Sequence, residues 1–422
     1  MALGGNMRLV VLGAGMMGRA VVYDLARSPD LRRLLVVDKD LRRAREVARR
    51  YGSGVALVAR ADAAHPKALA RLLRGFDVVV NCTHYGFNLS VMQAALEAKT
   101  HYVDLGGLFY TTRKQLRWHG KFRRAGLLAI LCMGSAPGLT NLMARLAADP
   151  LDEVHAIRIY NGARPDSIGA RETRPSTELL PVSFSLDTML DELTLKPVIF
   201  AGGKWREQPV LSGEEALDFP SPVGRQTVRF SLHSEALTLP MNYRKKGLRD
   251  CFFKINYDDE FVARVSFLAG LGLLGKEPVR VGSAKVSPRA MLHSLVAKQP
   301  GRSGGPEEAG DMEALRVVVE GIRAGRRQRR VVEAVIHASP EQHLSAVARD
   351  TGFPAAVAAR MIARNEITAR GVFAPESRQL GMPVERFFEE MALRGISITM
   401  KVPGRAGPGV PPGSLTVGKT AG

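Results

Sequence analysis

Side chains that can move protons follow three successive apolar stretches of the chain. Thr83 and His84 come directly after FDVVVNC, Asp104 ends HYVD, and Cys132 ends LLAILC. Runs that are apolar throughout predict strands covered on both faces of a parallel sheet, and ligands of such sheets lie beyond the carboxyl ends of the strands. We therefore expect these side chains to meet at one edge of a sheet, where a carboxylate, an imidazole or a thiol could act in proton transfer.

Each of these candidates also has a purely structural alternative. His84 can be an ordinary loop histidine, and Cys132 can be a small buried apolar residue. Asp104 can be a turn residue ahead of the two glycines that follow it. Tyr102 is a further candidate in the same stretch. The residues alone leave these roles open.

Three glycines at G-x-G-x-x-G spacing end the first apolar run, RLVVLGAGMMG. In a dinucleotide-binding turn Gly13 allows the tight turn, Gly15 lets the backbone approach a pyrophosphate, and Gly18 lets the next helix pack closely. The phosphates would lie at the N-terminus of that helix, near Met16 and Met17, where free N–H groups favour an anion. We predict a dinucleotide site; the alternative is a structural turn in an unrelated α/β domain.

An acidic residue follows the second apolar run, as a dinucleotide site requires. A carboxylate at Asp38 would accept hydrogen bonds from both ribose hydroxyls and repel a 2′-phosphate. We therefore predict NAD rather than NADP, although Lys39 could offset the repulsion. Asp62, after the third strand, could lie near the adenine or cap the next helix. The other residues expected to line the cofactor are Asn81, Cys82 and Thr83.

Apolar runs alternate with helical segments through the first part of the chain. The expected strands are residues 8–12, 34–37, 55–59, 76–82, 102–105 and 127–133, and the helices between them include 89–98 and 112–125. This alternation predicts an α/β fold with a mainly parallel, doubly wound sheet of the Rossmann type.

A set of motifs resembles a known family. GAGMMG, VVD, NCT, HYVDLGG and CMGSAPGLTN, in that order, are similar to the saccharopine dehydrogenase-like oxidoreductases and closest in pattern to lysine 6-dehydrogenase. FSLDTMLDEL, GEEALDFPSPVG and LHSEALTLP resemble the substrate domain of the same group, so the likeness covers about residues 7–400. It implies a Rossmann domain, a second α/β domain with a mixed sheet, a C-terminal helical segment that packs back on the first domain, and hydride transfer at a carbon bearing nitrogen.

This resemblance and the residue pattern together divide the chain into four parts. They are an NAD(P)-binding domain at 1–140, a substrate-binding and dimerisation domain at 141–340, C-terminal helices at 341–402, and a disordered tail rich in proline and glycine at 403–422. In the rest of the chain we expect strands at 153–160, 226–231 and 252–255, a hairpin of 314–321 with 329–336, and a helix at 186–192. Within 344–365 the stretch DTGFPAAVAARMIARN predicts a capped helix, with Pro354 in its first turn.

Substrate-binding candidates lie in the loop GSAPGLTN and in a polar cluster further along. Pro137, Gly138 and Asn141 belong to the loop. His233 and Glu235 could orient a zwitterionic substrate or form a capping network. Arginines that could bind a substrate carboxylate are Arg174, Arg225 and Arg244.

Composition and charge indicate which kinds of binding partner to expect. The formal net charge is +19, but the cations are spread along the chain and only residues 323–330 form a dense basic run, so we do not expect nucleic acid. Three scattered cysteines argue against a disulfide framework or a metal site. The N-terminus lacks the pattern of a secretory signal, and no apolar run could span a bilayer, so we expect a cytoplasmic protein without membrane contact. A homodimer or larger homo-oligomer is expected.

The leading interpretation is an NAD-dependent amino-acid dehydrogenase that acts on a C–N bond of a diamino acid or its imine, like lysine 6-dehydrogenase or saccharopine reductase. Asp104, which matches the acid of the family's YVDL motif, is then the expected base, and Tyr102, His84 and Cys132 line the pocket. The alternative is reductive amination of the carboxynorspermidine or homospermidine type, against which the positive net charge argues mildly. A third possibility is an NAD-binding regulator without catalysis.

Overall fold

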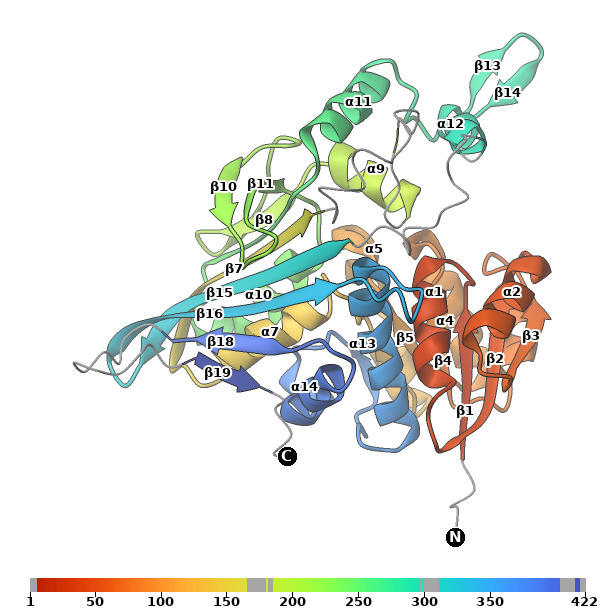
Figure 1. Ribbon diagram of the computed structural model, residues 1–422, viewed down its shortest axis with the longest axis horizontal. Helices are drawn as coiled ribbons and strands as arrows, with labels where there is room; N and C mark the ends of the chain where they lie inside the picture. The colour runs from red at the N-terminus through yellow and green to blue at the C-terminus, as the bar shows by residue number, and fades with distance from the viewer. Residues whose placement is uncertain are drawn as a thin grey trace.

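The computed structural model describes residues 6–164, 180, 185–296, 298, 311–402 and 414–417. They form two sheets with helices around and between them (Figure 1). No helix in this part of the chain combines the length and the apolar composition that crossing a bilayer requires.

The first sheet has seven strands, all parallel, in the order β17-β6-β5-β4-β1-β2-β3. Their bounds are β1 Met7–Leu12, β2 Leu31–Asp38, β3 Ala56–Arg60, β4 Val78–Asn81, β5 His101–Asp104, β6 Leu128–Ile130 and β17 Gly371–Phe373. The predicted Rossmann-type sheet is confirmed. Strand β17 was not predicted; it comes from the C-terminal part of the chain and pairs with β6.

Helices cover both faces of this sheet. They are α1 Met16–Leu25, α2 Leu41–Tyr51, α3 Pro66–Leu73, α4 Asn88–Ala98, α5 Leu108–Leu116 and α6 His119–Arg124, with a short 3-10 turn, η1, at Tyr85–Phe87. The core explains the continuous apolar run of β1, because Leu9 and Val11 enter one cluster while Val10 and Leu12 enter the cluster on the opposite face.

The single helix predicted for 112–125 is wrong. The structure has α5 and α6 instead, and the break between them lets each bury its apolar side chains in a different place. Phe109 of α5 packs with Leu237 of the second half of the molecule, whereas Phe122 of α6 packs under the first sheet.

The second sheet is mixed and has ten strands. They are β7 Glu153–Arg164, β8 Val198–Ala201, β9 Lys204–Glu207, β10 Glu215–Asp218, β11 Arg225–Phe230, β12 Asp250–Ile255, β15 Met312–Arg323, β16 Arg326–His337, β18 Ile398–Lys401 and β19 Ser414–Val417. The predicted hairpin is confirmed as β15 and β16, joined at Ala324 and Gly325, whose φ angles of 49° and 73° suit a two-residue turn. Helices associated with this half are α7 Leu139–Ala148, α9 Leu186–Thr194, α10 Glu235–Tyr243, α11 Asp259–Gly270 and α12 Pro288–Val296, and a separate hairpin pairs β13 Val279–Val281 with β14 Ala284–Val286.

The prediction of disorder for 403–422 is wrong for residues 414–417. These residues form β19 and pair antiparallel with β18, because the free edge of β18 offers backbone groups that an otherwise weakly apolar segment can bond. Residues 403–413 and 418–422 lie outside the described residues, as do 165–175 and the glycine-rich stretch 301–310. The division of the chain at residues 140 and 340 remains a prediction.

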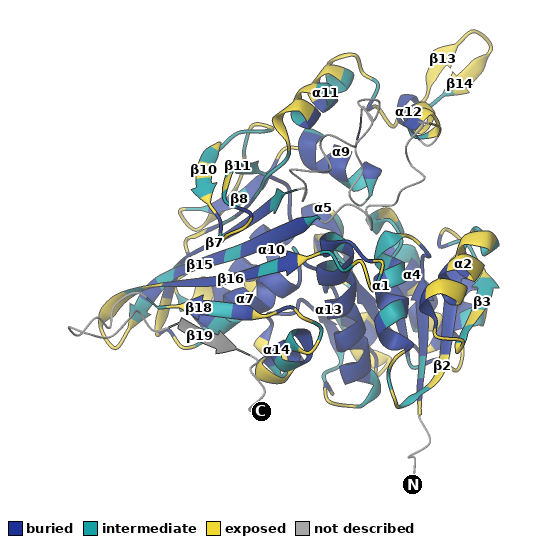
Figure 2. Ribbon diagram, viewed as in Figure 1, coloured by how far each residue is buried: buried dark blue, intermediate teal, exposed yellow. Residues whose placement is uncertain are grey.

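The C-terminal segment returns to the first sheet, as the resemblance implied. Helix α13, Ala346–Ala363, is largely buried and lies beside α1 (Figures 1 and 2). It begins after Ser345, whose side chain caps it, so Pro354 lies inside the helix and not in its first turn. The predicted helix start missed the segment before Pro354 because that proline was taken as an N-terminal signal.

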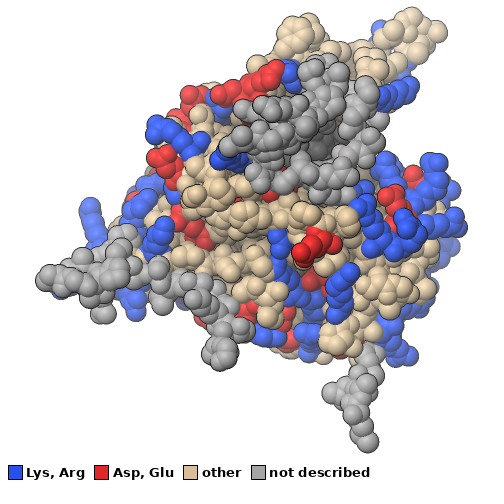
Figure 3. Space-filling model, viewed as in Figure 1, with Lys and Arg blue, Asp and Glu red and all other residues tan. Residues whose placement is uncertain are grey.

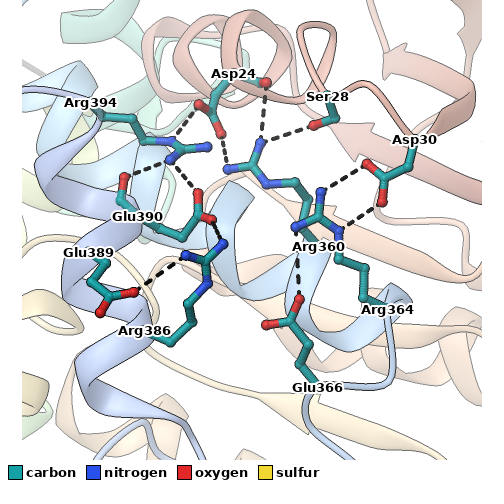
Figure 4. Close-up of polar contacts among 10 residues, drawn as sticks. All are labelled: Asp24, Ser28, Asp30, Arg360, Arg364, Glu366, Arg386, Glu389, Glu390 and Arg394. Atoms are coloured by element: carbon teal, nitrogen blue, oxygen red, sulfur yellow. Dashed lines mark hydrogen bonds and ion pairs between the residues drawn. The ribbon is translucent and has the colours of Figure 1, made fainter. Parts of the chain in front are cut away.

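Ion pairs fix the C-terminal helices on α1 (Figure 4). Asp24 of α1 forms an ion pair with Arg360 of α13 at 2.7 Å, and its Oδ1 accepts a hydrogen bond from Arg394, just after α14 (Val384–Ala392), at 2.6 Å. Arg364 forms two hydrogen bonds with Asp30, at 2.7 and 2.9 Å. Asp24 and Arg360 are both buried, so loss of either would leave an unpaired charge in the interior.

We expect Gly352→Ala to destabilise the protein. A Cβ at Gly352 would lie 2.6 Å from the Cβ of Ala20, so α13 and α1 would have to separate. The overpacking should lower the free energy of unfolding by about 1–3 kcal/mol, measured by denaturant titration. Gly270→Ala is the matched control, because a Cβ there meets nothing within 4 Å and alanine favours a helix. Equal stability of the two variants would contradict close packing at Gly352.

Candidate active site

The predicted cofactor residues meet at one edge of the first sheet. Leu12 is paired with Val37 and with Asn81, and Asn81 is paired with Asp104, so the strands end at the same level. Gly13, Asp38, Cys82 and Thr83 follow these ends directly. This is the edge at which open parallel sheets bind ligands.

The glycine turn fits a dinucleotide. Gly13 has a φ of 103°, and a Cβ there would lie 2.9 Å from the backbone of Cys82. A Cβ at Gly18 would lie 1.9 Å from the carbonyl oxygen of Gly13, so the packing of α1 requires glycine. Gly15 differs, because its φ is −83° and a Cβ would meet nothing within 4 Å. The protein itself gives no reason for a glycine at this position, whereas a pyrophosphate against α1 would give one. Met16 and Met17 form the first turn of α1.

Asp38 holds the glycine turn in place. Its Oδ2 accepts from the backbone N–H of Ala14 at 2.8 Å, and its Oδ1 accepts from that of Asp40 at 2.8 Å. The carboxylate therefore lies between the glycine turn and the start of α2, where a ribose would be bound. Asp62 accepts from the N–H of Ala64 at 2.9 Å, which makes it a turn residue; His65, and not Asp62, occupies the N-cap of α3.

The side chains of Asn81 and Cys82 are engaged within the protein, and the backbone of Cys82 packs against Gly13. The side chain of Asn81 is buried and donates to Asn88 Oδ1 at 3.0 Å. Thr83 Oγ1 donates to Asn81 Oδ1 at 2.7 Å, which fixes the turn after β4. Burial raises the pKa of the Cys82 thiol, so it stays neutral.

Asp104 lies in a buried network with five hydrogen-bond donors. Its Oδ2 accepts from the Tyr102 hydroxyl at 2.9 Å, from Gln115 Nε2 at 2.6 Å and from Asn88 Nδ2 at 3.2 Å. Its Oδ1 accepts from the backbone N–H of Cys132 at 2.7 Å and of Gly106 at 3.0 Å. The residue is fully buried, and this burial raises its pKa.

This network favours a structural role for Asp104 over the expected role of general base. Its carboxylate connects β5, α4, α5 and the loop after β6, and its acceptor positions are occupied by the protein. Tyr102 is also fully buried, with its hydroxyl between Asn81 and Asp104. Cys132 is buried at a strained φ of 58°, and burial raises the pKa of its thiol. A neutral buried thiol is a poor nucleophile.

One ring nitrogen of His84 is not engaged in a hydrogen bond with the described residues. Its Nδ1 accepts from the N–H of Gly86 at 3.1 Å, and its Nε2 has no hydrogen-bond partner among the described residues. Burial lowers the pKa of the ring, so neutral imidazole predominates at pH 7, with the proton assigned to Nε2 by the bond at Nδ1. His84 is therefore the candidate best placed to donate a proton.

The loop after β6 is rigid, and Asn141 is part of its frame. Gly138 has a φ of 133° and its N–H donates to Asn141 Oδ1 at 2.9 Å. Asn141 Nδ2 donates to Glu376 at 2.9 Å and to Thr238 at 3.2 Å, and the residue is fully buried. Pro137 packs beside Gly106. The predicted substrate contact of Asn141 is therefore not favoured, because both ends of its amide bond the protein.

His233 and Glu235 form a buried charged cluster next to this loop. His233 Nδ1 lies 3.2 Å from Glu235, and Nε2 lies 3.3 Å from Glu192 of α9. Burial alone would lower the pKa of His233, but the charges of Glu235 and Glu192 raise it to about 10. Glu235 also accepts from Thr140 at 3.1 Å, which ties the cluster to α7.

Two further carboxyls are buried near the loop after β6. They belong to Glu313 of β15 and Asp350 of α13. Asp350 accepts from the Ser135 hydroxyl at 3.0 Å, and Glu313 accepts from Asn161 of β7. The sequence analysis missed Glu192, Glu313 and Asp350. The sequence does contain a signal for two of them, because an acidic residue lies inside an apolar strand in DMEALRVVV and inside an apolar helix in AVARDTGF. Burying a carboxyl is costly, so such a residue is a candidate for a functional role.

The arginines proposed for a substrate carboxylate are not brought to the site. Arg225 begins β11, at the opposite end of that strand from His233, and its exposed side chain lies 3.8 Å from Asp218. Arg244 is exposed in the turn after α10. Arg174 lies outside the described residues.

We expect Gly15→Val to abolish dinucleotide binding in a folded protein. The side chain fits the free protein but would occupy the space assigned to the pyrophosphate, so the Kd for NADH should rise by roughly a hundredfold or more. Titration of nicotinamide fluorescence and a melting curve measure the two effects. Gly18→Val is the contrasting variant and should fail to fold. Unchanged affinity of a folded Gly15→Val variant would remove Gly15 from the site.

We expect Asp104→Asn to act on stability. The new amide N–H group would face donors where the carboxylate accepted hydrogen bonds, lowering the free energy of unfolding by about 1–3 kcal/mol. Asp62→Asn, with one such bond, serves as control. If instead kcat falls at least about a hundredfold with an unchanged melting temperature, Asp104 is the base.

Comparisons with known proteins agree with this architecture. Residues 9–130 match the saccharopine dehydrogenase NADP binding domain, and residues 134–396 match the saccharopine dehydrogenase C-terminal domain. The structure superposes on apo saccharopine dehydrogenase (L-Glu forming) from Saccharomyces cerevisiae with a TM-score of 0.71 at 18% identity, over 94% of this chain and 100% of that one.

Two relatives of assigned function are similar over most of their length. Carboxyaminopropylagmatine dehydrogenase from Synechocystis is 24% identical over 87% of this chain and 92% of its own. Carboxynorspermidine synthase from Vibrio cholerae is 26% identical over 71% of this chain and 72% of its own. These names favour the polyamine-type alternative over the lysine 6-dehydrogenase interpretation. The chain belongs to the saccharopine dehydrogenase family of oxidoreductases, with a pyridine-nucleotide cofactor.

Proposed function

We propose that the protein is an NAD-dependent oxidoreductase that joins an amine to an aldehyde by reductive amination, with a diamine or agmatine as the amine. The relatives named above support this reaction type, since both names describe carboxylated derivatives of an amine with more than one cationic group. The aldehyde that would supply a carboxyaminopropyl group is aspartate β-semialdehyde.

The observation that carries the proposal is the excess of buried carboxyls on the substrate side of the site. Glu192, Glu235, Glu313 and Asp350 are at most 5% exposed. Their hydrogen-bonding and ion-pairing partners described above include one cation, His233. Such a site attracts an ammonium or guanidinium group and repels a dicarboxylate.

The positive net charge does not argue against a cationic substrate. Figure 3 shows lysine and arginine side chains scattered over the visible surface and most numerous over the half that carries α2 and β3. The buried carboxyls contribute local charge of the opposite sign. Local charge decides recognition here, because surface charges are screened by water and salt.

The reaction needs a proton donor, and His84 is the candidate that this chain offers. The amine nitrogen attacks the aldehyde carbon, and the resulting hydroxyl must leave as water before the imine is reduced. His84 Nε2 is our candidate donor to that oxygen, because it is buried, has no partner among the described residues and belongs to a neutral ring. The reduced nicotinamide would supply hydride to the imine carbon, and Asp38 favours NADH over NADPH.

Steady-state assays of the purified full chain test the proposal. Reduced nicotinamide should be oxidised when aspartate β-semialdehyde is supplied with 1,3-diaminopropane or agmatine, and not when either partner is omitted. Lysine and saccharopine with oxidised nucleotide are the comparison substrates. Turnover of these two alone would overturn the proposal in favour of the diamino-acid dehydrogenase. Dinucleotide binding without turnover of any substrate would favour a regulator.

A further inference from the structure

Two buried carboxyl groups, those of Glu313 and Asp350, lie against one another, and neither forms an ion pair with a cation among the described residues. Their side chains are within hydrogen-bonding contact, and the residues are 5% and 0% exposed. Glu313 Oε2 meets no hydrogen-bond donor among the described residues. Two carboxylates that meet in this way require a shared proton or a bound cation.

The surrounding groups hold this pair in a fixed position. Glu313 Oε1 accepts from Asn161 Nδ2, Asp350 Oδ2 accepts from Ser135 Oγ at 3.0 Å, and Asp350 Oδ1 accepts from Thr351 Oγ1 at 3.3 Å. The oxygen left without a donor is Glu313 Oε2. The pair is thus built from β15 and α13 and is attached through Ser135 to the loop that begins directly after Cys132.

We propose that Glu313 and Asp350 form the subsite for the distal cationic group of the amine substrate, a second ammonium or a guanidinium. The inference rests on the proposed function and deepens it. In the free protein one proton is shared by the pair, and in the complex the cation replaces that proton and donates to Glu313 Oε2.

The chemistry assigns the distal group to this pair, and not the reacting amine. The nitrogen that attacks the aldehyde must be neutral, whereas a carboxylate pair would keep it protonated. Burial raises the pKa of Glu313, and burial together with the charge of Glu313 raises the pKa of Asp350 well above its usual range. A cation would relieve this repulsion, which also includes the charge of Glu192.

Substrates matched in length with and without a second cation test the subsite. 1,3-Diaminopropane is compared with propylamine, and agmatine with butylamine, each with aspartate β-semialdehyde and NADH. Wild-type protein should prefer the dication in kcat/KM. In Glu313→Gln this preference should fall by roughly a hundredfold, because the charge-assisted bonds to the distal cation are lost. The kcat/KM for the monoamines should stay within about threefold.

Two further variants control the comparison. Asp350→Asn should give the same loss of preference for the dication. It is used in place of Glu313→Gln if melting curves show that Glu313→Gln is unfolded. Glu320→Gln, on the same strand but 38% exposed and paired with Arg158, should leave both amines unaffected. Undiminished preference for the dication in a folded Glu313→Gln or Asp350→Asn variant overturns the subsite.

The experiments distinguish failure of the proposed subsite from failure of the proposed reaction. Turnover of diamines and monoamines with equal efficiency by the wild type overturns the subsite and leaves the reaction standing. If no amine is turned over, the reaction fails, and calorimetric titration of 1,3-diaminopropane and propylamine into the NADH-saturated protein tests the subsite alone. The subsite is supported if the diamine binds more tightly than propylamine and if Glu313→Gln removes this difference in affinity. It is overturned if the two amines bind equally or not at all.

Discussion

The close contact between α13 and α1 determines how the two halves of the site are held. Gly352 of α13 allows the backbone of α1 to approach, and the ion pairs of Asp24 with Arg360 and Arg394 close the same interface. Helix α1 follows the glycine turn, and α13 carries Asp350. One interface therefore sets the position of the phosphate-binding turn relative to the buried carboxyls, and a shift in it would change both together.

Burial raises the pKa of the carboxyls on both sides of the loop after β6, but the carboxyls differ in the hydrogen-bond donors they meet. Asp104 receives five hydrogen bonds, which satisfy its two oxygens and oppose the rise in its pKa that burial causes. The hydrogen-bonding capacity of Asp104 is thus satisfied by the protein alone. Glu313 and Asp350 face one another, and one of their oxygens has no donor among the described residues. This pair requires either a shared proton or a bound cation, and the proposed subsite depends on the exchange of one for the other.

The sequence predicted the features that depend on local pattern. The glycine turn, Asp38 and the strand ends at Thr83 and Asp104 follow from apolar runs and spacing, and the structure places them on one sheet edge. The role of Asp104 could not be predicted, because it depends on Asn88 and Gln115, whose side chains reach it from other elements. The pairing of Glu313 with Asp350 likewise arises from tertiary packing between a strand and a helix. Net charge is a weak guide to the substrate because it does not distinguish surface cations from buried anions.

Strand β17 has a consequence for how the molecule reaches its native state. Residues 371–373 complete the edge of the first sheet beside β6, whose residues are fully buried, although most of the chain separates the two strands. During synthesis the nucleotide-binding half leaves the ribosome long before its last strand exists. Until then the edge of β6 is open to other chains, so this half is not an excisable module, and its completion must wait for nearly the whole polypeptide.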